Sequence, residues 1–158
     1  MLRTVPVGKG EVSPSRHMRL HTCLHLLCTV ADAGVTGGAI DTHKARLDFD
    51  LPEPTLDKAK IAVELNRLIK EGRAVEARWI TDEQLAAQPE LGRTMSVRPP
   101  TGKGQVRLME VIEVDLQPCG GTHVASTAEI GPVRVLKLEK KSRHNRRVGI
   151  GFVEPRTY

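Results

Sequence analysis

The sequence predicts an α+β fold in which helices pack on a mainly antiparallel sheet. Two segments in the first half, 17–33 and 56–71, repeat apolar residues at helical spacing. The last third is instead rich in short alternating segments with glycine breaks between them, which predicts strands at 106–114, 130–138 and 147–153. Helices that precede a run of strands are typical of the α+β class.

The first predicted helix, 17–33, carries apolar residues at positions 20, 24, 27, 28 and 31. Gly34 follows it, where a glycine would cap the carboxyl end of the helix. The glycine-rich segment 34–38 (GVTGG) predicts a loop, and the alternation in 45–49 predicts a strand that Pro52 stops.

Thr55 is the predicted amino-terminal cap of the second helix, 56–71. The alternation of Val, Ala and Trp in 75–79 predicts a further strand. Thr81 and Gln84 have the spacing of a capping box at the start of a short helix.

Two segments predict no regular core element. Residues 89–104 hold three prolines and three glycines and are expected to form a loop. Residues 1–16 are mixed in character and are expected to form an arm or an edge strand, which leaves one domain over the rest of the 158-residue chain.

Composition excludes several classes of protein. No stretch is apolar enough to cross a bilayer and the start lacks a signal-peptide core, so a soluble, cytoplasmic protein without membrane partners is expected. The three cysteines are an odd number and cannot form a disulfide framework. The net charge of +5 suits an anionic partner, whereas the 3% aromatic content argues against a platform that stacks bases.

Two pairs of metal-ligand side chains stand out. His21 and His25 lie four residues apart on the first predicted helix, so both imidazoles project from one face. Cys119 and His123 flank a double glycine, which can form a turn that folds both side chains toward one point. Together the pairs predict a zinc site. Spacing leaves open whether four protein ligands form a closed structural site or a catalytic one.

A catalytic zinc site would need further groups. Zinc peptidases place a glutamate after the first histidine of His-Glu-x-x-His, but Thr22 occupies that position, which disfavours peptidase activity. Asp115 is the carboxylate nearest to Cys119 in the sequence and could orient a ligand histidine. A solvated aspartate at the end of a strand remains an equal alternative for Asp115.

The segments around these residues resemble the free-standing alanyl-tRNA editing proteins, relatives of the alanyl-tRNA synthetase editing domain and of the matching domain of threonyl-tRNA synthetase. The resemblance covers about residues 16–153. It rests on RLHTCLHLL around His21, RLDFD from Arg46, DLQPCGGTHV from Asp115, TAEIG from Thr127 and NRRVG from Asn145.

The resemblance implies an editing-domain fold over residues 17–158, with 1–16 as the arm or a remnant of an amino-terminal β-domain found in larger members. It implies a zinc-dependent deacylase of mischarged tRNA(Ala), chiefly Ser-tRNA(Ala), with Gly-tRNA(Ala) as a second candidate. A pocket for alanine excludes serine and glycine only weakly, so a second hydrolytic site is needed. The matching zinc ligands are His21, His25, Cys119 and His123.

Two further roles are predicted. Thr36 aligns approximately with a position that could bind the serine hydroxyl, although a threonine in a turn is an equal alternative. A basic hairpin near the carboxyl end would contact RNA phosphates, or it is simply a solvated turn. The predicted RNA-binding residues are Lys140, Lys141, Arg143, Arg146 and Arg147.

Three functions therefore compete. The first is the zinc-dependent deacylase. The second is a tRNA-binding module in which zinc is purely structural, and the third is a zinc hydrolase that acts on small esters or amides. The sequence resembles either the short, editing-only class or a shortened form of a longer member. It lacks the aminoacylation and anticodon-reading parts of a synthetase, so it is expected not to charge tRNA.

Overall fold

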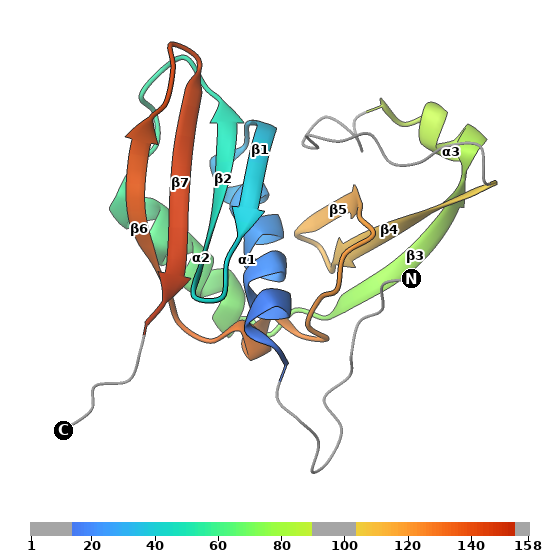
Figure 1. The fold of residues 1–158 in the computed structure, drawn as a ribbon. Helices are drawn as coiled ribbons and strands as arrows, with labels where there is room; N and C mark the ends of the chain where they lie inside the picture. Colours follow the sequence, from blue (N-terminus) through green and yellow to red (C-terminus); the bar gives the residue numbers. More distant parts are fainter. Residues whose placement is uncertain (1–13, 90–103, 154–158) are drawn as a thin grey trace.

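The computed structural model describes residues 14–89 and 104–153 and confirms the α+β class (Figure 1). Two antiparallel sheets have the strand orders β1-β2-β7-β6 and β3-β4-β5. The helices are α1 (Arg16–Ala31), α2 (Lys58–Lys70), α3 (Asp82–Ala86) and the 3-10 helix η2 (Thr127–Ile130). The strands are β1 (Gly34–Ile40), β2 (Lys44–Asp50), β3 (Val75–Thr81), β4 (Gln105–Val111), β5 (Asp115–Pro118), β6 (Val133–Lys140) and β7 (Asn145–Phe152).

Helices α1 and α2 cover one face of the four-stranded sheet, and no helix of the described residues packs on the other face (Figure 1). Inward-facing side chains of β2, β6 and β7 meet the apolar faces of both helices to form the main core. Phe49 of β2 and Leu65 of α2 are fully buried there. Among the described residues, no helix combines the length and apolar character needed to span a membrane.

Helix α1 begins one residue before the predicted start and ends earlier than predicted. The hydroxyl of Ser15 accepts a hydrogen bond from the Met18 amide at 3.2 Å and caps the helix. The carboxyl end is capped by Asp32, in the left-handed conformation at φ 49°, so the prediction of Gly34 as the cap was wrong. Aspartate tolerates this conformation better than most residues.

The prediction of a loop at 34–38 was also wrong, because this segment begins strand β1. Glycine has a low strand propensity, but pairing with β2 outweighs it. The register shifts between Val35 and Gly37, which leaves Thr36 in a bulge. A Cβ on Gly38 would lie 2.8 Å from a Leu47 methyl carbon and 3.1 Å from the Arg46 carbonyl oxygen, so a larger residue there would force Leu47 or the strand to shift.

Helix α2 is capped by Asp57, whose carboxylate accepts a hydrogen bond from the Lys60 amide at 3.0 Å. The predicted cap, Thr55, lies two residues upstream and was wrong. The predicted apolar stripe is confirmed, since Ile61, Leu65, Leu68 and Ile69 are all buried.

Replacing Leu65 with alanine is expected to lower the free energy of unfolding by about 3 kcal/mol, because the side chain is fully buried between α2 and the sheet. Val63 on the same helix is 65% exposed, so Val63→Ala is expected to change the free energy of unfolding by less than about 0.5 kcal/mol. Urea denaturation of both variants measures the difference. Equal effects would show that this helix face is not packed as described.

Strand β4 confirms most of the strand predicted at 106–114, but it ends at Val111 and pairs with β5, which was not predicted. The chain turns at 112–114, where Glu113 has a φ of 62°. This turn sends β5 back along β4 and directs the chain into the segment that begins at Cys119. The predicted capping box of Thr81 and Gln84 is present at the start of α3.

Candidate metal centre

The four predicted zinc ligands lie together. His21 and His25 project from α1, and Cys119 and His123 lie on the loop that follows β5. One ligand atom from each of the four lies within 4.8 Å of the others. The Cys119 Sγ atom lies 3.5 Å from His21 Nε2 and 3.4 Å from His123 Nε2. Ligands of a tetrahedral zinc ion lie about 3.6 Å apart for a nitrogen and a sulfur atom, so the donor set fits zinc.

The hydrogen bonds of His21 and His25 turn Nε2 of each ring toward the cluster. His21 Nδ1 lies 3.1 Å from the carbonyl oxygen of Thr122, which can only accept, so Nδ1 carries the proton. His25 Nδ1 lies 3.3 Å from a carboxylate oxygen of Asp115. Gln117 donates to the same oxygen at 2.7 Å and holds the carboxylate in place.

Thr22 fixes the third imidazole. Its hydroxyl donates its single proton to the Met18 carbonyl at 3.0 Å and accepts from the Val124 amide at 3.1 Å. The remaining contact, 3.0 Å to His123 Nδ1, must therefore be donated by the imidazole. All three histidines thus turn Nε2 toward the cluster, each held by a partner at Nδ1, which is the arrangement common among histidines of metal sites.

Replacing Thr22 with valine is expected to lower zinc affinity roughly ten- to a hundredfold, because His123 loses the acceptor that fixes its tautomer. Thr22→Ser keeps the hydroxyl and is expected to keep most of the affinity. Competition with a chromophoric chelator measures both. Equal affinities in the valine and serine variants would show that the hydroxyl does not orient His123.

Glycine at position 121 lets the loop approach α1. A Cβ on Gly121 would lie 1.8 Å from His21 Cε1, inside the ring's own volume. The Gly121 amide also lies 3.3 Å from the Cys119 Sγ atom and donates to it. Arg107 of β4 holds the loop from behind, since its guanidinium donates to the Gly121 carbonyl and its own carbonyl accepts from the Cys119 amide, both at 3.1 Å.

The metal-free site is strongly polarised. Burial alone would raise the pKa of the Cys119 thiol, but hydrogen bonds with His123, His21 and His25 outweigh burial and lower the pKa to about 3. Burial would likewise lower the pKa of His25, yet its contacts with Asp115 and Cys119 raise the pKa to about 9. Burial lowers the pKa of His123 to about 3, so this imidazole stays neutral. A thiolate and a neutral imidazole are the forms that bind zinc.

The low pKa of Cys119 predicts selective alkylation of the metal-free protein. At pH 7 iodoacetamide is expected to modify Cys119, because it is a partly exposed thiolate, and to spare Cys23 and Cys28, because burial raises their pKa values to about 12. Mass spectrometry of the peptides locates the label, and saturating zinc is expected to protect Cys119. Labelling of Cys23 or Cys28 at an equal rate would contradict this description of the site.

The structure places the other predicted site residues apart from one another. Of the two alternatives for Asp115, a partner of a histidine or a solvated aspartate, the structure shows the first, since its carboxylate contacts His25. Thr36 is in the bulge of β1, and its hydroxyl donates to Asn145 Oδ1 at 3.2 Å. Its role with serine stays a prediction.

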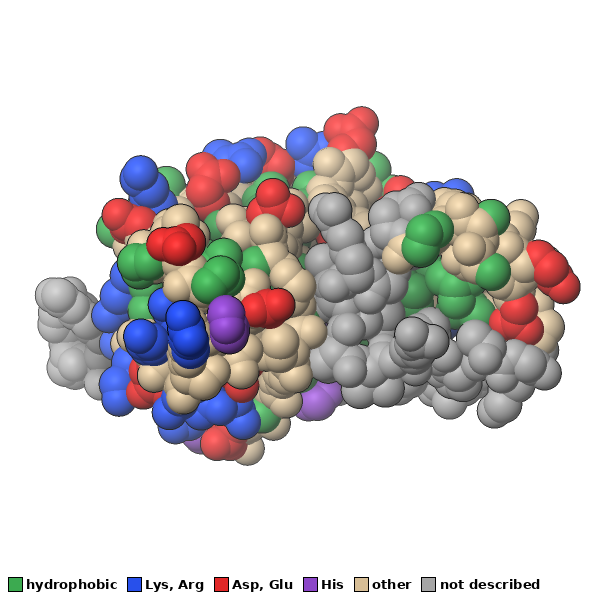
Figure 2. All heavy atoms as spheres, turned by 90° about the horizontal axis from the view of Figure 1, so that it is seen from above, with side chains coloured by type: hydrophobic (Ala, Val, Ile, Leu, Met, Phe, Trp, Pro, Cys, Tyr) green, Lys and Arg blue, Asp and Glu red, His purple; other side chains and the backbone are tan. Residues whose placement is uncertain are grey.

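The predicted RNA-binding residues lie on and beside the β6–β7 hairpin, where basic side chains gather (Figure 2). Lys141 pairs with Glu139 at 3.0 Å, and Arg147 pairs with Asp48 at 2.8 Å. Arg146 donates to backbone carbonyls, including that of Pro52. Within the described part of the chain, Lys140 and Arg143 form no ion pair.

Sequence reasoning missed three residues that support the cluster: Thr22, Arg107 and Gln117. Thr22 lies three residues before His25 and therefore on the same face of the helix. That position was the only indication in the sequence that Thr22 lies near the cluster. The pairing of β4 with β5 brings Arg107 to the loop, and spacing along the chain gives no sign of that.

Comparison with known proteins defines the class of this fold and site. Residues 106–148, which include Cys119 and His123, match the family described as threonyl and alanyl tRNA synthetase second additional domain. The chain is 32% identical over 140 residues to the alanyl-tRNA editing protein AlaX-M of Methanosarcina acetivorans, covering 84% of this chain and 56% of that protein. It is 32% identical over 141 residues to AlaX-M of Saccharolobus solfataricus, covering 84% and 57%.

An alanine–tRNA ligase of Methanococcus vannielii is 29% identical over 143 residues, which cover 84% of this chain and 16% of the ligase. Residues 106–148 are thus similar to the second additional domain of threonyl and alanyl tRNA synthetases. More particularly, the chain is a relative of the alanyl-tRNA editing proteins, which confirms the resemblance found in its sequence. It spans a little over half the length of the editing proteins that it matches.

Proposed function

We propose that this chain is a zinc-dependent deacylase that hydrolyses the ester of mischarged tRNA(Ala), chiefly Ser-tRNA(Ala), with Gly-tRNA(Ala) as a second substrate. The observation that carries the proposal is the convergence of three Nε2 atoms and one thiolate on a single point, within a chain related to alanyl-tRNA editing proteins. A bound zinc ion would supply Lewis-acid chemistry, since it polarises a carbonyl and lowers the pKa of water to about 7.

The chain's own residues prepare this site. Asp115 and Gln117 hold His25, and Thr22 holds His123, so the donor atoms are oriented before any substrate binds. Gly121 leaves the space that the imidazole of His21 occupies.

Thr36 is our candidate for the group that binds the serine hydroxyl. Its exposed hydroxyl has one described partner, Asn145, and an oxygen lone pair remains to accept from a ligand. A polar group of this kind would distinguish a seryl ester from an alanyl ester more strongly than an apolar pocket could.

The basic hairpin is our candidate for contact with the phosphates of the RNA. Lys140 and Arg143 support this best, because each is exposed and has no ion pair within the described residues. Lys141, Arg146 and Arg147 already have partners in the protein and would contribute less.

Hydrolysis of Ser-tRNA(Ala) and Ala-tRNA(Ala) by the purified protein tests the function. We expect zinc-loaded protein to release serine much faster than alanine, and His21→Ala to lose the activity. Absence of serine release by the unmodified protein overturns the proposal. The protein could also hydrolyse small seryl esters without being inhibited by Ser-tRNA(Ala). That result would favour a small-ester hydrolase instead.

The four-donor cluster supports a second candidate, an RNA-binding module with structural zinc, because four protein ligands are typical of a closed site. This alternative predicts that chelation of zinc unfolds the protein and that the zinc-loaded protein binds tRNA without cleaving the ester.

A further inference from the structure

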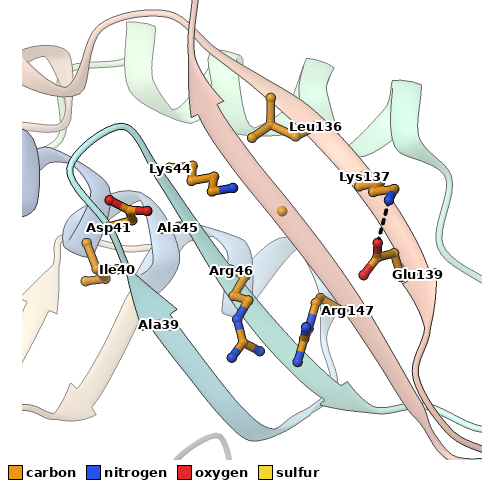
Figure 3. A pocket seen from close by; sticks show the side chains of 11 residues that line it. Ala39, Ile40, Asp41, Lys44, Ala45, Arg46, Leu136, Lys137, Glu139 and Arg147 are labelled. Carbon is orange, nitrogen blue, oxygen red and sulfur yellow. Dashed lines mark ion pairs between the residues drawn. The ribbon is translucent and has the colours of Figure 1, made fainter.

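The face of the four-stranded sheet that carries no helix has a hollow in its middle (Figure 3). Its volume is about 400 Å³, within the range of small-ligand sites. All four strands of the sheet contribute to it, since residues of β1, β2, β6 and β7 line its walls. None of the predicted metal ligands lines it.

The hollow exists because β7 has glycine on its outward face. Val148 and Ile150 point into the core, so the residue between them, Gly149, points outward. The register places Gly149 between Arg46 of β2 and Lys137 of β6. Across these three strands, the outward-facing residues Arg46, Gly149 and Lys137 thus lie side by side, with a cation at each end and no side chain between them.

The walls combine basic and apolar groups. Lys44, Arg46, Lys137 and Arg147 line the hollow together with the apolar side chains of Leu136 and Ala39. Figure 3 shows Lys44, Arg46 and Arg147 over the same face, with Leu136 on the neighbouring strand β6. The register of β6 shifts between Val135 and Lys137, which frees Leu136 from the ladder.

Charge favours an anionic occupant. Asp48 pairs with both Arg46 and Arg147, and Glu139 pairs with Lys137. Asp41 also lines the hollow, so three acids, Asp41, Asp48 and Glu139, accompany the four cations Lys44, Arg46, Lys137 and Arg147. Lys44 forms no ion pair within the described ranges, and the cations outnumber the acids by one. The acids hold the guanidinium groups in place, which lowers the entropic cost of binding a phosphate.

We propose that this hollow binds one nucleotide of the RNA that the proposed function brings to the protein. A phosphate lies between Lys44 and Arg46, and the ribose or base lies over Gly149 against Leu136. This inference rests on the proposed function for the identity of the partner, and it adds a second contact surface that shares Arg147 with the basic hairpin. Phosphate contacts of this kind give affinity that depends on salt and little on sequence.

The test is binding of uncharged tRNA(Ala) transcript to Lys44→Gln/Arg46→Gln over a series of salt concentrations, followed by fluorescence anisotropy. We expect about a tenfold loss of affinity at low salt and a salt slope smaller by roughly 0.8, as for one phosphate contact. Gly149→Asp is expected to weaken binding similarly, because a Cβ there makes ordinary contacts, at 3.8 Å from Leu136 Cβ, and its carboxylate would enter the hollow.

The matched control is Lys58→Gln/Lys60→Gln, which removes the same charge from exposed positions of α2, a helix that packs on the opposite face. Thermal melting checks that all variants fold. Equal tRNA affinity in the hollow variant and the control overturns the proposal. Loss of binding to phosphatidylserine vesicles with unchanged tRNA binding also overturns it and indicates a membrane surface. Since uncharged tRNA is the probe, the result is independent of whether the protein hydrolyses an ester.

Discussion

Replacing Gly121 with alanine is expected to abolish zinc binding while leaving the fold intact. The added methyl group would lie 1.8 Å from His21 Cε1 and 2.4 Å from Nδ1, so the imidazole and the loop cannot both keep their positions. The loop is held by Arg107 from behind, which leaves His21 as the group that moves. We expect zinc affinity to fall by more than about a hundredfold, beyond the loss typical of removing an outer partner of a ligand.

Zinc stoichiometry after dialysis and competition with a chelator measure this effect. Gly149→Ala is a suitable control, because a Cβ at that position has no contact closer than 3.8 Å. Normal zinc binding by Gly121→Ala would show that the loop can move away from α1. The close contact between Gly121 and His21 would then not be needed for the site.

Removing His123 is expected to have a double effect, on zinc and on stability. The side chain is fully buried, and its ring stacks on that of His21 with 4.1 Å between centroids. His123→Ala therefore loses a ligand and also leaves a cavity, and we expect the metal-free protein to lose about 3 kcal/mol of unfolding free energy. The hydroxyl of Thr22 also loses a hydrogen-bond donor.

His21→Ala separates the two effects. The His21 side chain is only partly buried, so its removal is expected to eliminate zinc binding with a stability loss below about 1 kcal/mol in the metal-free state. Chemical denaturation of both variants in the presence of a chelator gives the comparison. Equal destabilisation by the two substitutions would contradict the distinction between a core histidine and a ligand at the edge of the site.

The sequence was sufficient to predict which residues gather at the site but not how they are oriented. The spacing of His21 and His25 on a helix, and of Cys119 and His123 around two glycines, predicted one shared point, and the structure brings the four together. The tautomer of His123 depends on a hydroxyl 101 residues away, and such a contact leaves no periodicity in the sequence.

The same limit explains the errors in the fold. Strand β1 was predicted as a loop because its glycines have low strand propensity, whereas pairing with β2 decides its conformation. The predicted strand 106–114 ran past the end of β4 at Val111, and β5 was not predicted, because the turn at Glu113 lacks a glycine or proline. Helices with strong apolar stripes, such as α2, were predicted correctly because the signal is local.

The central claim is that zinc at this cluster makes the chain an editing deacylase. Its most direct test is the rate of serine release from Ser-tRNA(Ala) by metal-free protein to which zinc is added stepwise, with the melting temperature followed in the same samples. We predict that the rate rises with zinc and levels off at about one equivalent per chain, and that Gly121→Ala stays inactive. A zinc-loaded, fully folded protein that releases no serine would contradict the account.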